Sequence, residues 1–112
     1  MKELSKAEEI FLLTIWRLKD NAYGVSIRDK IIELTGKKYT YGTLYGILDQ
    51  LVHREYIRKE EGEPSAERGG RRKLFYFLTN EGLEALKHSY EVHQSMWDGV
   101  ARSILNKDIN YE

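Results

Sequence analysis

The stretch from Tyr39 to Val52 constrains the fold most, because one side of it is apolar and the other is small, polar and aromatic. Its apolar residues recur at intervals of three and four, which predicts a helix with one buried face. These residues are Leu44, Ile47, Leu48, Leu51 and Val52. The opposite side carries Tyr41, Gly42, Tyr45, Gly46, Asp49 and His53.

Two glycines on one exposed side of a helix are unusual, because each costs about 1 kcal/mol relative to alanine. They indicate that a partner approaches the backbone closely. A polar, aromatic first turn of low bulk is typical of a recognition helix that lies in the major groove of DNA. An ordinary surface helix of weak propensity has the same pattern, and this stretch alone leaves both interpretations open.

A first helix is predicted from Ser5 to about Lys19, because Ser5 and Glu8 have the spacing of a capping box. Its apolar residues cover more than one stripe, which indicates a central position in the core or contact with a second chain. They are Ile10, Phe11, Leu12, Leu13, Ile15, Trp16 and Leu18.

A second helix is predicted from Val25 to Thr35, after a turn at residues 20–24. Gly36 is its expected C′ cap. Its apolar stripe is narrow and consists of Ile27, Ile31 and Leu34. Thr40 is the expected N-cap of the helix that follows. Two helices joined by a short connection, of which the second begins with an exposed polar turn, form a helix-turn-helix.

The chain after residue 52 changes to the pattern of two strands. Residues 56–61 and 71–78 have strand character, and the segment between them contains the only Pro and three of the nine Gly. Acidic residues precede basic ones along this hairpin, in the order Glu60, Glu61, Glu63, Glu67, Arg68, Arg71, Arg72 and Lys73. A hairpin after a helix-turn-helix is the wing of a winged helix, and its basic strand can lie along DNA phosphates. A solvated charge run is the alternative interpretation.

A single long helix is predicted from a cap at Thr79 to about Leu105. Some of its residues follow the spacing of a heptad seam, namely Leu83, Leu86, Tyr90, His93, Trp97, Val100 and Ile104. About 26 residues make a helix of about 40 Å, too long to be covered by the rest of the chain, so a two-fold homodimer is expected. The fold class is therefore mainly α (α+β), a winged helix-turn-helix with a long C-terminal dimerisation helix. Its expected parts are a winged-helix domain at 1–78, the dimerisation helix at 79–106 and a disordered tail at 107–112.

Composition excludes several other classes of protein. The 112 residues suit one domain, and the absence of Cys excludes disulfides and thiolate chemistry. With no apolar run long enough for a membrane span and no signal-peptide core, a soluble cytoplasmic protein is expected. The three His share no metal-ligand spacing, and no phosphate loop or nucleophile motif is present, so no enzyme activity, metal or cofactor is expected. The balance of 18 basic and 18 acidic residues favours a rival interpretation, in which the exposed helix binds a protein.

Two motifs accompany the predicted helices and hairpin: Gly42-Thr43-Leu44-Tyr45 in the central helix and Gly69-Gly70-Arg71-Arg72-Lys73 before the second strand. Together with Tyr76, Leu78, Thr79 and Gly82, they resemble the PadR family of bacterial transcriptional regulators over about residues 5–90. The single C-terminal helix resembles the short-chain subfamily. This resemblance implies a dimeric winged-helix repressor that binds a double-stranded DNA operator. In some members a flat aromatic or cationic compound enters a pore between the first and last helices at the dimer interface and weakens operator binding.

Some positions depart from the family pattern. Gly46 stands where members often have Pro, so the first turn of the central helix is expected to be less rigid. Glu55 stands where many have Gly, and because a left-handed conformation would cost about 1 kcal/mol there, a different turn is expected. The stacking Trp of ligand-binding members aligns near His93, whereas Trp97 lies one turn later. The resemblance therefore implies an effector pocket of Trp16, His93 and Trp97, unless Trp97 only packs in the dimer interface.

DNA contacts are assigned to two main groups of residues. The central helix is expected to meet the major groove through Tyr41, Gly42, Thr43 and Tyr45. Its glycine permits close approach, its hydroxyls bond phosphates or base edges, and its rings pack on sugars or thymine methyl groups. The wing is expected to bind phosphates or enter a minor groove through Arg71, Arg72 and Lys73, with an affinity that falls with salt. Further candidates at the helix starts are Ser26, Lys38 and Thr40.

Overall fold

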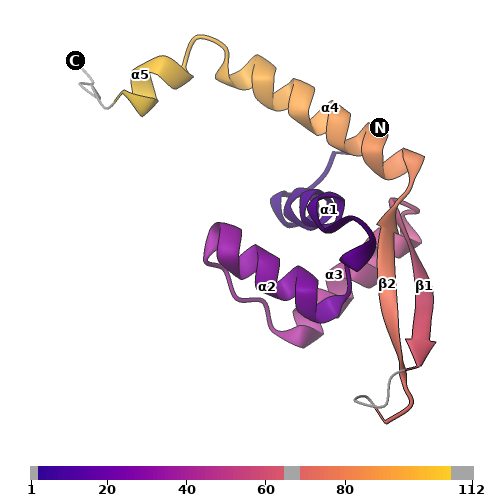
Figure 1. The fold of residues 1–112 in the computed structure, drawn as a ribbon. Coiled ribbons are helices and arrows are strands. Elements are labelled where there is room, and N and C mark those ends of the chain that lie inside the picture. The colour runs from indigo at the N-terminus through magenta and orange to yellow at the C-terminus, as the bar shows by residue number, and fades with distance from the viewer. Residues whose placement is uncertain (1–2, 65–68, 107–112) are drawn as a thin grey trace.

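The computed structural model describes residues 3–64 and 69–106. Three helices come first, α1 (Lys6–Leu18), α2 (Gly24–Thr35) and α3 (Tyr41–His53), with a 3₁₀ helix η1 (Lys19–Asn21) between α1 and α2. An antiparallel sheet of β1 (Ile57–Pro64) and β2 (Arg72–Leu78) follows, and then α4 (Asn80–Trp97) and α5 (Ala101–Leu105). The hairpin stands beside the three-helix cluster, while α4 crosses α1 and extends beyond it (Figure 1). This is a winged helix, as predicted.

The core is built around α1, which contacts α2, α3, α4 and β2. The largest fully buried side chains of the core are Phe11, Leu12, Ile15, Ile27, Ile31, Leu44, Leu48, Leu51, Ile57 and Tyr76. The apolar face predicted for α3 is confirmed, since its three leucines are fully buried and Ile47 and Val52 pack partly against them. The narrow stripe of α2 is shorter than predicted. Leu34 is half exposed because it lies in the last turn of α2, at the end farthest from the sheet (Figure 1).

The predicted helix caps are confirmed. The Glu8 amide donates to the Ser5 hydroxyl at 3.1 Å, and the Ser5 amide donates to the Glu8 carboxylate at 2.8 Å, which completes the capping box of α1. Gly36 ends α2 in the left-handed conformation with φ 77°. Thr40 caps α3 by accepting a hydrogen bond from the Thr43 amide at 3.2 Å.

The turn after α3 corrects the expectation for Glu55. Glu55 has φ 64°, so it takes the left-handed conformation in place of the different turn that was expected. Its amide donates to the Val52 carbonyl at 2.9 Å and the next amide, that of Tyr56, donates to the Leu51 carbonyl at 3.0 Å. These two bonds form a Schellman motif. The Thr79 hydroxyl also donates to the Glu55 carbonyl at 2.6 Å, so hydrogen bonds hold the turn against the steric cost of the Cβ.

Glu55→Gly is expected to raise the free energy of unfolding by up to about 1 kcal/mol, because glycine adopts positive φ without a Cβ clash. Glu55→Ala is the matched control, since it removes the same carboxylate but keeps the Cβ. Urea unfolding followed by circular dichroism measures both variants. Equal stabilities would show that this turn stores no strain.

The sheet joins residues 57–64 to residues 72–78, so β1 extends three residues beyond its predicted end. Ile57 pairs with Leu78, the register is regular up to Glu61 opposite Leu74, and it shifts before Pro64. The predicted hairpin tip at residues 65–68, with Glu67 and Arg68, lies outside the described residues.

The C-terminal helix is interrupted. Thr79 caps α4 as predicted by accepting from the Gly82 amide at 3.0 Å. The prediction of one continuous helix is wrong, because α4 ends at Trp97 and the chain turns at Gly99, whose φ is 79°. Glycine in this conformation commonly ends a helix. The heptad seam is therefore divided, with Val100 and Ile104 beyond the break.

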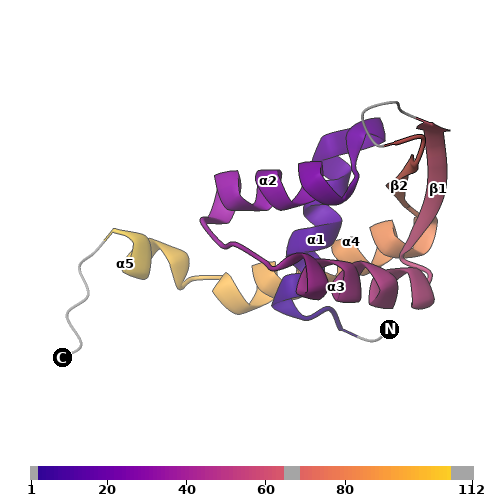
Figure 2. The ribbon, with the colours of Figure 1, turned by 90° about the horizontal axis from the view of Figure 1, so that it is seen from below.

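The second half of α4 and α5 reach away from the winged helix (Figure 2). Within α4, burial is restricted to Gly82 and Ala85 in its first part. The tail predicted at 107–112 lies outside the described residues. Of the helices in the described part of the chain, none is long and apolar enough to cross a membrane.

Candidate nucleic-acid interface

The exposed side of α3 is open at both of its glycines. A Cβ added at Gly42 or Gly46 would meet no other described atom within 4 Å. Two other glycines differ, since a Cβ at Gly24 would overlap the Tyr45 ring and one at Gly82 would overlap the Tyr56 carbonyl. Gly82 is therefore required by the neighbouring backbone and Gly24 makes room for the Tyr45 ring, whereas Gly42 and Gly46 leave room for something outside the fold.

Two tyrosines flank this open side. The rings of Tyr41 and Tyr45 stack with centroids 6.3 Å apart, and they remain 44% and 41% exposed. The Arg28 guanidinium carbon lies 5.0 Å from the centroid of the Tyr41 ring. Tyr45 leans toward α2, where its hydroxyl lies beside Gly24.

The Tyr76 hydroxyl lies in the core below this surface, and its pKa is raised to about 12. Burial is the main cause, and the nearby Tyr45 and Asp49 add to it.

The hydroxyls at the helix starts are partly engaged inside the protein. The Thr40 hydroxyl caps α3 and also lies 3.1 Å from that of Thr43. Ser26 accepts from the Tyr23 amide at 2.9 Å and donates to the Asn21 carbonyl at 2.6 Å. Ser26 is therefore a capping residue at the start of α2, and its contact with a phosphate stays a prediction. Lys38 is exposed between α2 and α3.

The cations of the wing lie at the start of β2. The Arg72 Nε is 3.8 Å from the Glu61 carboxylate of β1, and its Nη1 donates to the Gly62 carbonyl at 3.4 Å. The Lys73 ammonium lies 4.1 Å from the centroid of the Tyr23 ring, and Arg71 is exposed just before the strand. Ion pairs as exposed as that of Arg72 stabilise a fold by about 1 kcal/mol or less, so a phosphate can replace the carboxylate at little cost.

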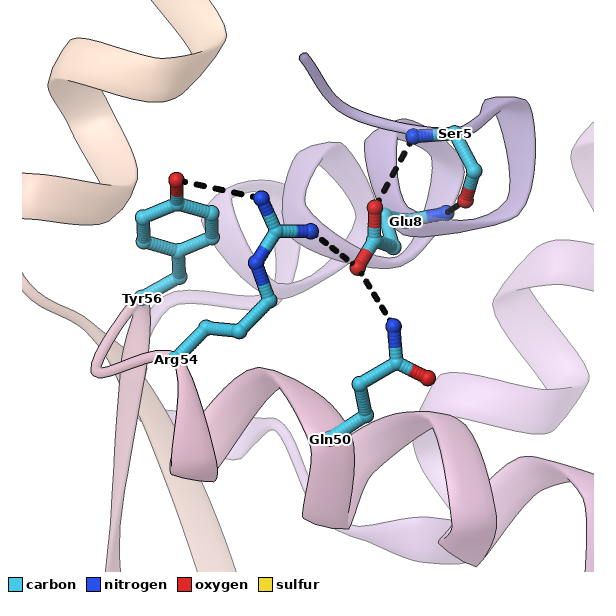
Figure 3. A network of polar contacts seen from close by, with 5 residues as sticks. All are labelled: Ser5, Glu8, Gln50, Arg54 and Tyr56. Carbon is cyan, nitrogen blue, oxygen red and sulfur yellow. Dashed lines mark hydrogen bonds and ion pairs between the residues drawn. The ribbon is translucent and has the colours of Figure 1, made fainter. Parts of the chain in front are cut away.

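A partly buried polar network, centred on the buried Glu8, links the end of α3 to the start of α1 (Figure 3). The Glu8 carboxylate accepts from Arg54 Nη1 at 2.5 Å and from Gln50 Nε2 at 2.9 Å, and Arg54 Nη2 donates to the Tyr56 hydroxyl at 3.3 Å. Burial alone would raise the pKa of Glu8, but the hydrogen bonds from Arg54 and Ser5 lower it below its usual value. The sequence indicated Glu8 only as a cap, and its link to α3 was missed.

The residues of the expected effector pocket are not brought together in one chain. Trp16 is 52% exposed near the end of α1, where the Lys19 ammonium lies 3.2 Å from the centroid of its ring. His93 Nε2 is 4.0 Å from the carboxylate of Glu9, near the start of α1. Trp97 is 45% exposed at the end of α4. A pocket that contains all three aromatic residues would need a second copy.

The heptad seam is largely exposed. Its exposed members are Leu83, Tyr90, His93, Trp97, Val100 and Ile104, whereas Leu86 packs partly against the core. Leu13 and Trp16 of α1, and Met96 and Leu105 beside the seam, are exposed as well. So many large apolar side chains on α1, α4 and α5 are typical of an interaction surface.

A helix-turn-helix whose second helix exposes an open first turn, followed by a two-stranded wing, defines the winged-helix class of DNA-binding proteins. The chain belongs to the transcriptional regulator PadR-like family, whose model matches residues 12–88. The resemblance stated from the motifs is thus confirmed. Members of this family are transcriptional regulators and not enzymes. No curated protein matched the chain.

Several solved structures are similar to this chain. A PadR family transcription regulator from hypervirulent Clostridium difficile R20291 is 28% identical, with a TM-score of 0.63, over 88% of this chain and 97% of that one. A transcriptional regulator from Clostridium thermocellum is 25% identical, with a TM-score of 0.65, over 92% of both chains. F93 from STIV, a winged-helix DNA-binding protein, is 21% identical, with a TM-score of 0.66, over 85% of this chain and 95% of that one. This last likeness concerns the fold alone.

Proposed function

We propose that this regulator is a dimeric, cytoplasmic repressor that binds a specific double-stranded DNA operator through α3 and the wing. The observation that carries the proposal is the open side of α3, where two glycines with free space stand beside two stacked tyrosines. A protein surface of this shape suits the major groove, because the backbone can approach base edges while aromatic rings and hydroxyls flank it.

The residues of the interface have different roles in this proposal. Gly42 allows close approach, and Tyr41 and Thr43 contact base edges or thymine methyl groups. The remaining residues hold the DNA backbone and carry no sequence information of their own. They are Lys38 and Thr40 before α3 and Arg71, Arg72 and Lys73 in the wing.

The dimer is proposed to form through the exposed apolar side chains of α1 and α4. Two-fold symmetry would place two copies of α3 at half-sites about 34 Å apart, one turn of DNA. The break at Gly99 separates Val100 and Ile104 from the rest of the seam. We therefore assign the main interface to the part of the seam on α4, namely Leu83, Leu86, Tyr90, His93 and Trp97.

A small aromatic or drug-like ligand is proposed to relieve repression by binding between the two copies. Trp16 and Trp97 are both exposed and aromatic, and they lie on the two helices assigned to the interface. A ligand there shifts the dimer away from DNA only if it binds the non-operator geometry more tightly. Trp97 fluorescence during a ligand screen reports such binding.

Gly42→Ala separates the fold from the function. Alanine should raise the free energy of unfolding by up to about 1 kcal/mol, because it favours helix and has free space at this position. The same methyl group should weaken binding to DNA from upstream of the protein's own gene by about tenfold, because it holds α3 away from the base edges. Urea unfolding and fluorescence anisotropy measure the two effects.

Gly46→Ala is the matched control, since a Cβ there also meets free space but lies one turn farther along α3 than Gly42. It should give the same gain in stability with a smaller loss of affinity. If Gly42→Ala stabilises the protein and leaves DNA affinity unchanged, α3 does not approach DNA at this turn.

A further inference from the structure

A pocket of about 200 Å³ lies between the helix-turn-helix and the wing. Its lining comes from residues 23–25 before and within α2, from Tyr45 of α3 and from residues 72–74 of β2. It therefore joins the two parts of the proposed DNA interface, which are far apart in the sequence.

The pocket has the chemistry of an anion site. Both charged side chains that line it, Arg72 and Lys73, are cations, and none of its described lining residues is acidic. The ring of Tyr23 lies 4.1 Å from the Lys73 ammonium and holds this cation at the edge of the pocket. Glu61, which pairs with Arg72 at 3.8 Å, does not line the pocket.

Tyr45 contributes a hydroxyl to the pocket because Gly24 makes room for it. A Cβ at Gly24 would overlap the hydroxyl oxygen and the Cζ of Tyr45, so any other residue there would force the ring away. Among the hydrogen bonds of the described residues, none uses the Tyr45 hydroxyl as donor or acceptor. A phenolic hydroxyl beside two cations is well suited to donate to an anionic oxygen.

We propose that this pocket binds one phosphate group of the DNA backbone, with Tyr45 as hydrogen-bond donor and Arg72 and Lys73 as the neutralising charges. The inference rests on the proposed function and refines it. Tyr45 becomes a residue that positions the DNA between α3 and the wing, whereas Tyr41, its stacking partner, faces the bases. Contacts to phosphate fix the register of a protein on the duplex without reading its sequence.

Tyr45→Phe tests the assignment because it removes only the hydroxyl and keeps the ring. The loss of one hydrogen bond to a charged group should weaken binding by about tenfold, both to the upstream DNA and to a random duplex of the same length. The ratio of the two affinities should stay unchanged. Tyr41→Phe is the matched control and should not produce this uniform loss. Fluorescence anisotropy at fixed salt measures the affinities of the wild-type protein and of both variants for the two duplexes.

Inorganic phosphate provides a readout that does not depend on DNA. In ¹H–¹⁵N NMR spectra of the wild-type protein, the amides of Gly24 and Val25 should shift in a saturable way as phosphate is added. The shifts should be reduced in Tyr45→Phe and in Lys73→Gln. A circular dichroism melt of each variant establishes that it is folded.

Three results would overturn the assignment. A loss confined to the upstream DNA would mean that Tyr45 reads a base. If phosphate shifts the amide signals of Gly24 and Val25 but Tyr45→Phe leaves DNA affinity unchanged, the pocket binds free phosphate and not the DNA backbone. Shifts spread equally over exposed lysines such as Lys30 would mean that the pocket binds no phosphate of its own. If the wild-type protein binds no duplex, the proposed function fails. The phosphate titration then shows only whether the pocket binds inorganic phosphate.

Discussion

Glu8→Gln is expected to lower the free energy of unfolding by about 3 kcal/mol, because it leaves the Arg54 guanidinium largely buried without its carboxylate. The side chains of Glu8 and Arg54 are only 6% and 16% exposed. Glutamine has nearly the same size as glutamate, so the loss reports charge and hydrogen bonding and not a cavity. Urea unfolding at neutral pH measures it.

Glu33→Gln is the matched control for this prediction. The Glu33 carboxylate pairs with the Lys30 ammonium at 2.9 Å, but its side chain is 63% exposed. Removing such a surface pair should change stability by no more than about 0.5 kcal/mol. Similar losses in the two variants would contradict the structural role assigned to the buried network.

The same network predicts how stability depends on pH. The folded-state pKa of Glu8 lies below its usual value of 4.5, because the hydrogen bonds from Arg54 and Ser5 outweigh the opposite effect of burial. The unfolded chain then binds protons more readily than the folded one, so this contribution is present above about pH 4.5 and is lost as the pH falls below it. The acid limb of the stability curve should accordingly be flatter in Glu8→Gln.

Leu83→Glu is expected to separate the dimer into single chains of 13.2 kDa. Leu83 is 44% exposed on α4, so the charge is tolerated in a single chain but would lie within the proposed interface. Operator affinity should fall at least about hundredfold, because each half-site is then bound without the effective concentration supplied by the second copy. Sedimentation velocity and fluorescence anisotropy measure the two effects.

Leu34→Glu is the matched control for the oligomeric state. It makes the same chemical change at a leucine that is 50% exposed, but on α2 and away from the seam. Its mass should remain that of the wild-type protein. A mass that is unchanged in Leu83→Glu would exclude this part of α4 from the interface.

The helices and the wing could be predicted because their signals are local. Ser5 with Glu8, Gly36 and Thr40 each satisfy backbone groups within a few residues, and the structure uses all of them as caps. The apolar face of α3 follows from its spacing alone. The break at Gly99 was missed because the apolar spacing continues through it, although the glycine itself was the available signal.

Features that depend on distant parts of the chain could not be predicted. Arg54 and Gln50 reach Glu8 only because α3 packs on α1, more than forty residues away in the sequence. The left-handed Glu55 is held partly by Thr79, the N-cap residue of α4. The direction of Tyr45 depends on Gly24, whose contact with that ring the sequence did not indicate.

The most direct test of the account is an anisotropy titration of the wild-type protein with the duplex from upstream of its own gene, in excess random DNA, at low and moderate salt. We predict binding that survives the competitor, with a logarithm of affinity that falls linearly with the logarithm of salt concentration as phosphate contacts are lost. No binding, or equal binding to the random duplex, would contradict specific recognition and would favour the interpretation that α3 binds another protein.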